Sequence, residues 1–141
     1  GRSGNAGQAC TAAKRFIVVD PRADVFLAEF MAALGDFKPG NPIDPKTSLG
    51  PLSSQEARDN LLDQVKRATA AGAKIAIGGQ RVDVPGVFMQ PTILTDIDKS
   101  NPAYKEEFFG PVALFFRVAD EAAAIALAND SPYGLGGSVF T

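Results

Sequence analysis

The chain of 141 residues is 45% hydrophobic and 21% charged, the size and composition of one globular domain with a hydrophobic core. Its 14 Lys and Arg residues against 16 Asp and Glu give a formal charge of −2, and their scattering excludes a nucleic-acid-binding surface. With no histidine and a single cysteine, the chain lacks a Cys-His or Ser-His catalytic pair, a tetrahedral zinc site and an internal disulfide, so no metal is expected.

The first predicted elements are a strand and a helix. Arg15–Val19 is β-branched and aromatic and too short for a helix, which predicts a buried strand ended by Asp20-Pro21. Apolar residues recur at helical spacing from Ala23 to Leu34, and Gly35 stands where a C-cap glycine is expected. Between Phe37 and Leu52, four prolines and two glycines predict a long ordered loop.

A second helix and two strands are predicted next. The sequence Ser53-Ser54-Gln55-Glu56 resembles a capping box in which Ser53 accepts from the N–H of Glu56. The helix would run to Ala71, with Gly72 just past its end. Lys74–Ile77 predicts a strand, and so does Phe88–Leu94, where Pro91 implies an edge position or a bulge.

The last third of the chain repeats this alternation. We expect a turn at Ser100–Pro102, a strand at Val112–Val118, a helix at Glu121–Asn129 with Asp120 as its N-cap, and a final strand at Gly136–Phe140. The pattern predicts an α/β fold in which helices flank a largely parallel sheet. No stretch approaches the roughly 20 apolar residues of a membrane span, and no glycine-rich phosphate-binding loop is present.

Cys10 is the first candidate for chemistry. It follows Asn5-Ala6-Gly7-Gln8-Ala9, and Thr11–Arg15 is expected to form a first helical turn. Helix N–H groups and the charges of Lys14 and Arg15 would favour the thiolate, which is the nucleophilic form. The alternative is a small buried hydrophobic residue, which is what most free cysteines are.

Three other segments combine residues that suit either a site or a scaffold. Lys105–Val112 joins two carboxylates and two phenylalanines ahead of a strand, where α/β sheets collect ligand groups. Asn129–Leu135 favours a helix stop with turn residues. Gln90–Leu94 favours the entrance of a strand.

Together these segments resemble the aldehyde dehydrogenase family. Gly7–Cys10 matches the family's Gly-Gln-x-Cys nucleophile motif, and Pro91-Thr92-Ile93-Leu94 matches a second motif. Glu106–Val112 is similar to Glu-Glu-Ile-Phe-Gly-Pro-Val, and Asn129–Leu135 to Asn-x-x-x-Tyr-Gly-Leu. The four segments have the family's order and spacing and cover essentially the whole chain.

The resemblance implies that Cys10 is the catalytic nucleophile, which forms a thiohemiacetal with an aldehyde. Hydride would then pass to NAD or NADP, and the resulting thioester would be hydrolysed. The backbone N–H of Cys10 would hold part of the oxyanion. Glu107 would bind the hydroxyls of the nicotinamide ribose and Phe109 would pack beside that end of the cofactor, whereas Glu106 and Phe108 carry no such role.

The resemblance also implies that residues 1–141 are part of a catalytic domain. The cofactor-binding domain, the glutamate that activates water and the asparagine of the oxyanion hole would lie outside the chain, both of whose ends look cut. We therefore expect the isolated chain to be inactive and, with uncovered apolar surface, to self-associate. The parent would be a cytoplasmic homo-oligomer without a nucleic-acid or membrane partner.

Within the family, Asn5–Phe16 and Gly72–Gly79 look most like succinate-semialdehyde dehydrogenases. Many of these carry an arginine just before the asparagine, suited to a bidentate grip on the substrate carboxylate. Here that position is Gly4, with Arg2 nearby. The alternatives are a dehydrogenase for another small aliphatic aldehyde and a non-catalytic scaffold in which Cys10 is a redox-sensitive thiol.

Overall fold

A four-stranded sheet lies at the centre of the computed structural model, which describes residues 1–141. The strands are β1 (Arg15–Val19), β2 (Lys74–Ile77), β3 (Thr92–Thr95) and β4 (Val112–Val118), in the order β1-β4-β3-β2. Strand β4 pairs in parallel with β1 and β3, and β2 pairs antiparallel with β3. The predicted α/β class with a largely parallel sheet is therefore confirmed.

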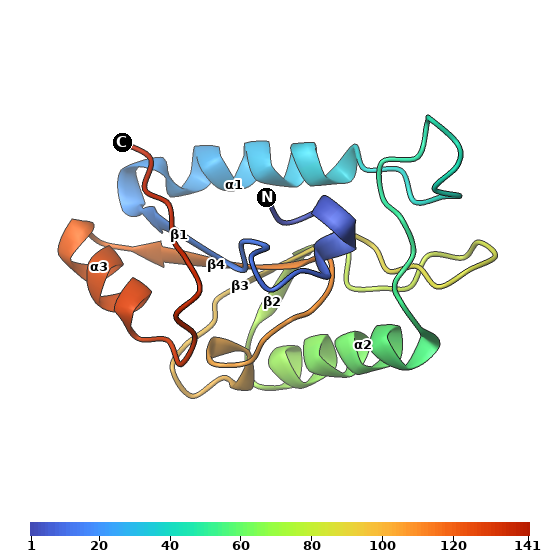
Figure 1. The fold of residues 1–141 in the computed structure, drawn as a ribbon. Helices are drawn as coiled ribbons and strands as arrows, with labels where there is room; N and C mark the ends of the chain where they lie inside the picture. The colour runs from blue at the N-terminus through green and yellow to red at the C-terminus, as the bar shows by residue number, and fades with distance from the viewer.

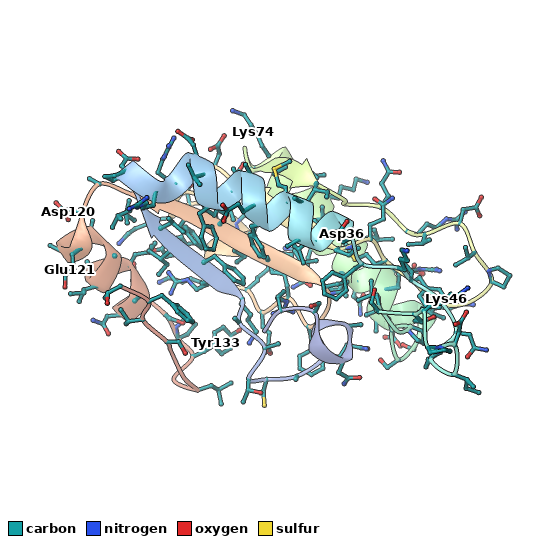
Figure 2. The ribbon with its side chains drawn as sticks, turned by 90° about the horizontal axis from the view of Figure 1, so that it is seen from above. Asp36, Lys46, Lys74, Asp120, Glu121 and Tyr133 are labelled. Carbon is teal, nitrogen blue, oxygen red and sulfur yellow. The ribbon has the colours of Figure 1, made fainter.

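Two long helices cover opposite faces of this sheet (Figure 1). Helix α1 (Asp20–Gly35) lies on one face and α2 (Gln55–Ala70) on the other, while α3 (Glu121–Asn129) lies beside β1. Figure 2 shows Asp120 and Glu121, at the start of α3, at the opposite end of the molecule from Lys46 on the long loop. None of these helices has both the length and the apolar character that crossing a membrane requires.

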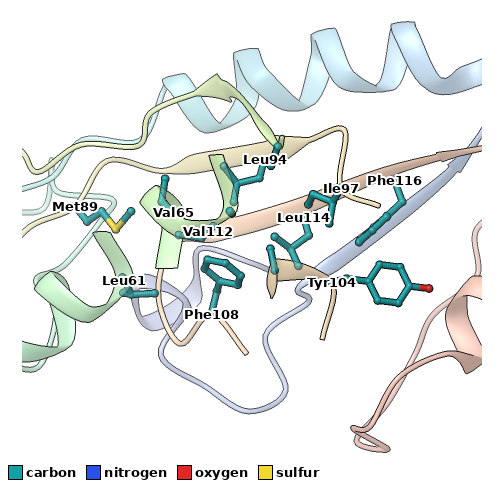
Figure 3. Packing of buried hydrophobic residues seen from close by; sticks show 14 of the residues in the cluster. Leu61, Val65, Met89, Leu94, Ile97, Tyr104, Phe108, Val112, Leu114 and Phe116 are labelled. Atoms are coloured by element: carbon teal, nitrogen blue, oxygen red, sulfur yellow. The ribbon is translucent and has the colours of Figure 1, made fainter. Parts of the chain in front are cut away.

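The two faces of β4 belong to two separate hydrophobic clusters. Val112, Leu114 and Phe116 lie in the cluster that also contains residues of α2 (Figure 3), whereas Ala113 and Phe115 lie in the cluster that contains residues of α1. This follows from the period of two in a strand, which sends alternate side chains to opposite faces. Burial on both faces explains why Val112–Phe116, the first five residues of β4, form a continuous apolar run, as the strands of parallel sheets do.

Several element boundaries differ from the sequence predictions. Asp20-Pro21 ends β1 but also begins α1, because proline fits the first helical turn, where its missing N–H is not needed. Gly35 is the last residue of α1 and has no positive φ. Strand β3 starts only at Thr92, after Pro91, and the 3-10 helix η2 (Pro102–Tyr104) follows the expected turn.

The N-cap of α2 is Ser54 and not Ser53, so the predicted capping box is off by one residue. The Ser54 hydroxyl accepts from the backbone N–H of Ala57 at 3.0 Å. Helix α2 ends at Ala70, and Gly72 past its end has φ +104°. The loop from Phe37 to Leu52 is irregular apart from one bridge between Pro39 and Leu49, as predicted.

The predicted strand Gly136–Phe140 is wrong. Residues 136–141 have no regular structure, and Val139 and Phe140 are 87% and 94% exposed. A β-strand needs a neighbour that pairs with its backbone, and the sheet contains only β1 to β4. The apolar side chains of this segment therefore remain uncovered within the chain.

Candidate active site

Cys10 lies in an exposed turn between the 3-10 helix η1 (Gly4–Gly7) and β1. The interpretation of Cys10 as a buried hydrophobic residue is therefore wrong. The expected helical turn at Thr11–Arg15 is wrong as well, because the chain turns at Thr11 and then enters β1. A turn, and not a helix N-terminus, therefore presents Cys10, the predicted nucleophile.

Three consecutive residues ahead of Cys10 have positive φ angles. Asn5, Ala6 and Gly7 have φ of 49°, 53° and 75°, a region that residues other than glycine rarely adopt. The Asn5 side chain donates to the carbonyl of Gln8 at 3.2 Å, and the Gln8 N–H donates to the carbonyl of Asn5 at 3.1 Å. Such strain persists only where the surroundings hold it, and it gathers at functional sites.

Gly7 brings the Cys10 turn against the segment ahead of β4. A Cβ built on Gly7 would lie 2.1 Å from the carbonyl oxygen of Gly110, closer than any real Cβ contact. The positive φ and this approach both require glycine at position 7. Glycine in the Gly-Gln-x-Cys motif is thus explained by packing on Gly110.

Gln8 connects the same turn to the chain before α2. Its Oε1 accepts from the backbone N–H of Ser53 at 2.7 Å, and its Nε2 donates to the carbonyl of Pro51 at 3.3 Å. Sequence reasoning gave Gln8 no separate role, because its partners lie far along the chain. Its amide fixes the position of the turn that carries Cys10.

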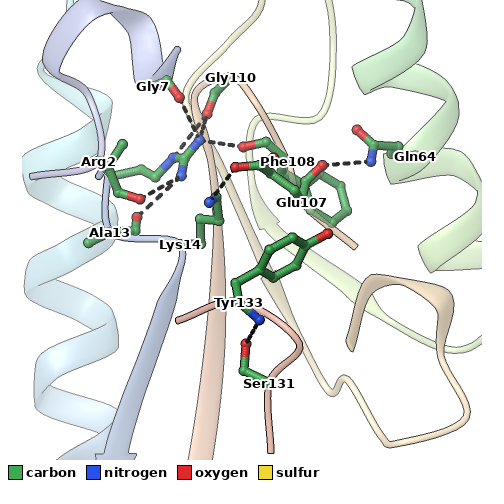
Figure 4. A network of polar contacts seen from close by, with 11 residues as sticks. Arg2, Gly7, Ala13, Lys14, Gln64, Glu107, Phe108, Gly110, Ser131 and Tyr133 are labelled. Carbon is green, nitrogen blue, oxygen red and sulfur yellow. Dashed lines mark hydrogen bonds and ion pairs between the residues drawn. The ribbon is translucent and has the colours of Figure 1, made fainter. Parts of the chain in front are cut away.

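Arg2 is buried between the Cys10 turn and the segment ahead of β4, with 3% of its surface exposed. Its three nitrogens donate only to backbone carbonyls (Figure 4): those of Gly110 at 2.9 Å, Phe108 at 2.6 Å, Gly7 at 3.0 Å, Ala12 at 3.3 Å and Ala13 at 3.4 Å.

Burial lowers the pKa of Arg2 to about 10, against the opposing effect of the Glu107 carboxylate. The guanidinium therefore stays charged at neutral pH. Because backbone carbonyls accept from all three of its nitrogens, the Arg2 side chain is fully engaged within the chain.

Glu107 lies beside the chain that leads from Cys10 into β1. Its Oε1 is 2.5 Å from Nζ of Lys14, and its backbone carbonyl accepts from Nε2 of Gln64 at 2.9 Å (Figure 4). Two long-range contacts therefore hold Glu107, one at its carboxylate and one at its backbone.

The residues that flank Glu107 differ sharply in their surroundings. Glu106 is bound by Arg67 of α2 through both oxygens, at 2.6 and 3.1 Å, and Phe108 is fully buried in the core below α2. Phe109 is 47% exposed and takes part in no aromatic pair. Glu106 and Phe108 hold the segment to the body of the protein, and Phe109 presents its ring outward.

The segment Asn129–Leu135 ends α3 and turns toward the same region. Lys14 Nζ lies 5.5 Å from the centroid of the Tyr133 ring. Asp130 accepts from the Tyr104 hydroxyl at 2.9 Å and pairs with Lys99 at 2.7 Å. The helix stop predicted here is present, because α3 ends at Asn129, and the segment that follows places Tyr133 next to the Lys14–Glu107 pair.

Thr92, at the start of β3, supports the sheet. Its buried hydroxyl donates to the carbonyl of Gln90 and accepts from the N–H of Gly79, both at 2.8 Å. This agrees with Gln90–Leu94 as a strand entrance. Nowhere in the chain do His, Cys, Asp or Glu side chains group in the arrangement of a metal site.

The model of the aldehyde dehydrogenase family matches residues 1–141, the whole chain. The chain belongs to the aldehyde dehydrogenase family. The resemblance carried by its four motifs is thereby confirmed.

Two succinate-semialdehyde dehydrogenases are similar to the chain in sequence or in structure. The succinate-semialdehyde dehydrogenase [NADP(+)] of Deinococcus radiodurans is 53% identical over the whole chain, which covers 30% of that relative. The structure of Streptococcus pyogenes succinic semialdehyde dehydrogenase with NADP+ matches with a TM-score of 0.97 and 47% identity, over 99% of this chain and 31% of that one.

A second subgroup of the family has the same fold. Betaine aldehyde dehydrogenase of Staphylococcus aureus, in complex with NAD+, matches with a TM-score of 0.93 and 40% identity, over 97% of this chain and 28% of that one. The chain thus spans about 30% of the length of the relatives it matches.

Proposed function

We propose that the chain is part of the catalytic domain of an NAD(P)-dependent aldehyde dehydrogenase, that Cys10 is its nucleophile and that succinic semialdehyde is its substrate. The observation that carries this proposal is the exposed Cys10 in a strained Gly-Gln-x-Cys turn. Arg2 holds that turn against the segment that contains Glu107 and Phe109. The names of the two succinate-semialdehyde dehydrogenases support the choice of substrate.

Cys10 would act through its thiolate, which attacks the carbonyl carbon of the aldehyde. The S–C bond forms, the carbonyl oxygen becomes an oxyanion, and the backbone N–H of Cys10 donates to it. Loss of hydride from that carbon leaves a thioester on Cys10. Attack by water on the thioester carbon then breaks the C–S bond, releases the carboxylate and two protons, and returns the Cys10 thiolate.

A nicotinamide cofactor would accept the hydride when bound. Glu107 and Phe109 suit that end of the cofactor, because a carboxylate accepts hydrogen bonds from ribose hydroxyls and an exposed ring offers a flat apolar surface. One similar structure is in complex with NADP+ and another with NAD+, so the proposal includes both cofactors. Because the chain has no glycine-rich phosphate loop, we expect most of the cofactor contacts outside residues 1–141.

Replacing Cys10 tests the proposal. In the longer protein that contains this sequence, Cys10→Ala should lower aldehyde oxidation by roughly a thousandfold or more, as loss of a covalent nucleophile does. Cofactor binding should stay within about twofold, since the cofactor does not depend on the sulfur. Unchanged turnover in Cys10→Ala would overturn the proposal. Turnover by the 141-residue chain alone would overturn the claim that these residues are only part of the catalytic domain.

The substrate is tested by comparing kcat/KM for succinic semialdehyde and for butanal, a neutral aldehyde of the same chain length. The absence of a side chain at Gly4, together with the backbone contacts of Arg2, favours a second candidate, a dehydrogenase of neutral aliphatic aldehydes. A preference of tenfold or more for succinic semialdehyde, about 1.4 kcal/mol, supports the first candidate. Equal values support the second.

We also propose that the 141-residue chain self-associates and that the longer protein is a cytoplasmic homo-oligomer. Leu135, Val139 and Phe140 are exposed, and contiguous exposed apolar surface favours association. The exposed free thiol of Cys10 suits a reducing compartment. Sedimentation at rising concentration tests the first part, and a strictly monomeric chain would contradict it.

A further inference from the structure

We propose that Lys14 is a positioning residue of the cofactor subsite, one that holds the Glu107 carboxylate ready for the nicotinamide ribose. The inference rests on the proposed function of Glu107. Lys14 lies outside the Gly7–Cys10 motif, four residues after Cys10 in the chain. Its side chain connects the segment after Cys10 to the Glu107 carboxylate through an ion pair.

The Lys14–Glu107 pair is shielded from solvent in a way that the other ion pairs are not. The separation of Nζ and Oε1 is 2.5 Å, with the two side chains 14% and 32% exposed. In every other pair at least one side chain is more than 40% exposed. Surface pairs contribute little because water and salt screen them, whereas a shielded pair holds its geometry better.

The Lys14 ammonium is fixed from its other side by Tyr133. Nζ lies 5.5 Å from the centroid of the ring, within the range of a cation–π contact. Figure 4 shows Lys14 close to both Glu107 and Tyr133. The backbone is fixed as well, because the carbonyl of Lys14 accepts from the N–H of Leu114 in β4 at 2.8 Å.

Glu107 is held at its backbone by groups other than Lys14. Gln64 donates to its carbonyl at 2.9 Å, and Arg2 donates to the next carbonyl, that of Phe108, at 2.6 Å. Lys14 is the one side chain that forms an ion pair with the carboxylate itself, and Arg2 acts on it only through its charge. Without Lys14, the backbone of Glu107 would keep its place and the side chain would gain rotamer freedom.

Lys14 leaves room for a ligand on Glu107. The ammonium meets Oε1, and an ionised carboxylate has about four lone-pair positions on its two oxygens. The carboxylate can therefore accept from ribose hydroxyls while Lys14 holds it. Fixing a side chain before binding removes an ordering cost that the ligand would otherwise bear.

A double-mutant cycle in the longer protein tests this role. The variants are Lys14→Met, Glu107→Gln and the two combined, and the measurement is the Kd of NADP+ or NAD+, whichever the unmodified protein binds more tightly. We expect Lys14→Met to raise the Kd by roughly three- to thirtyfold, which lies within the range of coupling between contacting residues. The double variant should be no weaker than Glu107→Gln alone, because Lys14 acts only through that carboxylate.

Three further variants complete the experiment. Lys14→Arg, which keeps the charge, should restore most of the affinity. Lys66→Met is the matched control, because Lys66 is exposed on α2 and forms no ion pair, and it should leave the Kd unchanged. If Lys14→Met fails to fold, Lys14→Gln takes its place in the same cycle.

The outcomes separate this inference from the function it rests on. If Glu107→Gln raises the Kd and Lys14→Met does not, the role of Lys14 is overturned and that of Glu107 stands. If the two effects add in the double variant, Lys14 acts through general structure and the inference is overturned. If Glu107→Gln leaves the Kd unchanged, the proposed role of Glu107 fails first, and that of Lys14 fails with it.

Discussion

Nε of Arg2 donates to the carbonyl oxygen of Gly110 at 2.9 Å, across a sequence separation of 108 residues. The same buried guanidinium donates to the carbonyls of Gly7 and Phe108. The turn that presents Cys10 and the segment that presents Glu107 are therefore held as one unit. Relative positions of this kind decide whether a nucleophile and a cofactor can meet in reactive geometry.

Replacing Arg2 should destabilise the chain strongly. Arg2→Met leaves several buried carbonyls without donors, each costing about 1–3 kcal/mol, so we expect a loss of about 3 kcal/mol or more in the free energy of unfolding. Urea unfolding of the 141-residue chain measures it. Arg22→Met, an exposed arginine of α1 without an ion pair, is the control, and equal stability of the two variants would contradict the role of Arg2.

Gly7 should not tolerate a side chain. In Gly7→Ala the Cβ would meet the Gly110 carbonyl at a residue whose φ is +75°, so strain and overpacking together should cost more than about 2 kcal/mol. Gly4→Ala is the matched control, because a Cβ there meets no atom within 4 Å and φ is not positive. Similar urea midpoints for the two variants would show that the Gly7–Gly110 approach does not matter.

Ser54 should contribute more stability than Ser53. Ser54→Ala removes the hydroxyl that accepts from Ala57 and should cost about 1 kcal/mol, the usual value of an N-cap. Ser53→Ala should cost less than about 0.5 kcal/mol, because only its backbone N–H is used, toward Gln8. The free energies of unfolding of the two variants rank the two serines, and the reverse order would restore the predicted capping box.

Features that depend on neighbouring residues could be predicted from the sequence. Strands β1 and β4 follow from apolar, β-branched and aromatic runs, and Asp120 caps α3 as predicted, accepting from Ala123 at 2.8 Å. The N-cap of α2 was missed by one residue because two serines stand side by side and the Ser-x-x-Glu pattern begins at Ser53, whereas the third residue after the true cap, Ser54, is Ala57. Local sequence signals predict that a helix or strand is present more reliably than they predict the residue at which it begins.

Features that depend on distant partners could not be predicted. Gly136–Phe140 has the composition of a strand, but no strand lies beside it to pair with. The residues after Cys10 suit a helix, yet the chain must enter β1, whose Arg15 pairs with Leu114. The role of Arg2 gave no local signal, since its acceptors are carbonyls that any residue type could supply.

Asp130 should make the free energy of unfolding of the chain depend on pH in the acidic range. Hydrogen bonds from Lys99 and from the Tyr104 hydroxyl hold the pKa of Asp130 below its ordinary value of 3.8, against a smaller opposing effect of burial. As the pH falls, the unfolded chain therefore takes up this proton before the folded chain does. The contribution of Asp130 is fully present above the unfolded pKa and is lost as the pH falls through the lower, folded pKa.

The Asp130→Asn variant isolates this contribution, because an amide keeps the size of the side chain and cannot ionise. Its urea midpoint should lie below that of the unmodified chain at pH 5, and the gap should close as the pH falls below 3.8. Asp83→Asn is the control, since Asp83 is exposed and forms no ion pair, and its curve should follow the unmodified chain throughout. A gap for Asp130→Asn that stays constant down to pH 2.5 would mean that the carboxylate contributes through shape and not through charge, because only an ionised group loses its partners on protonation.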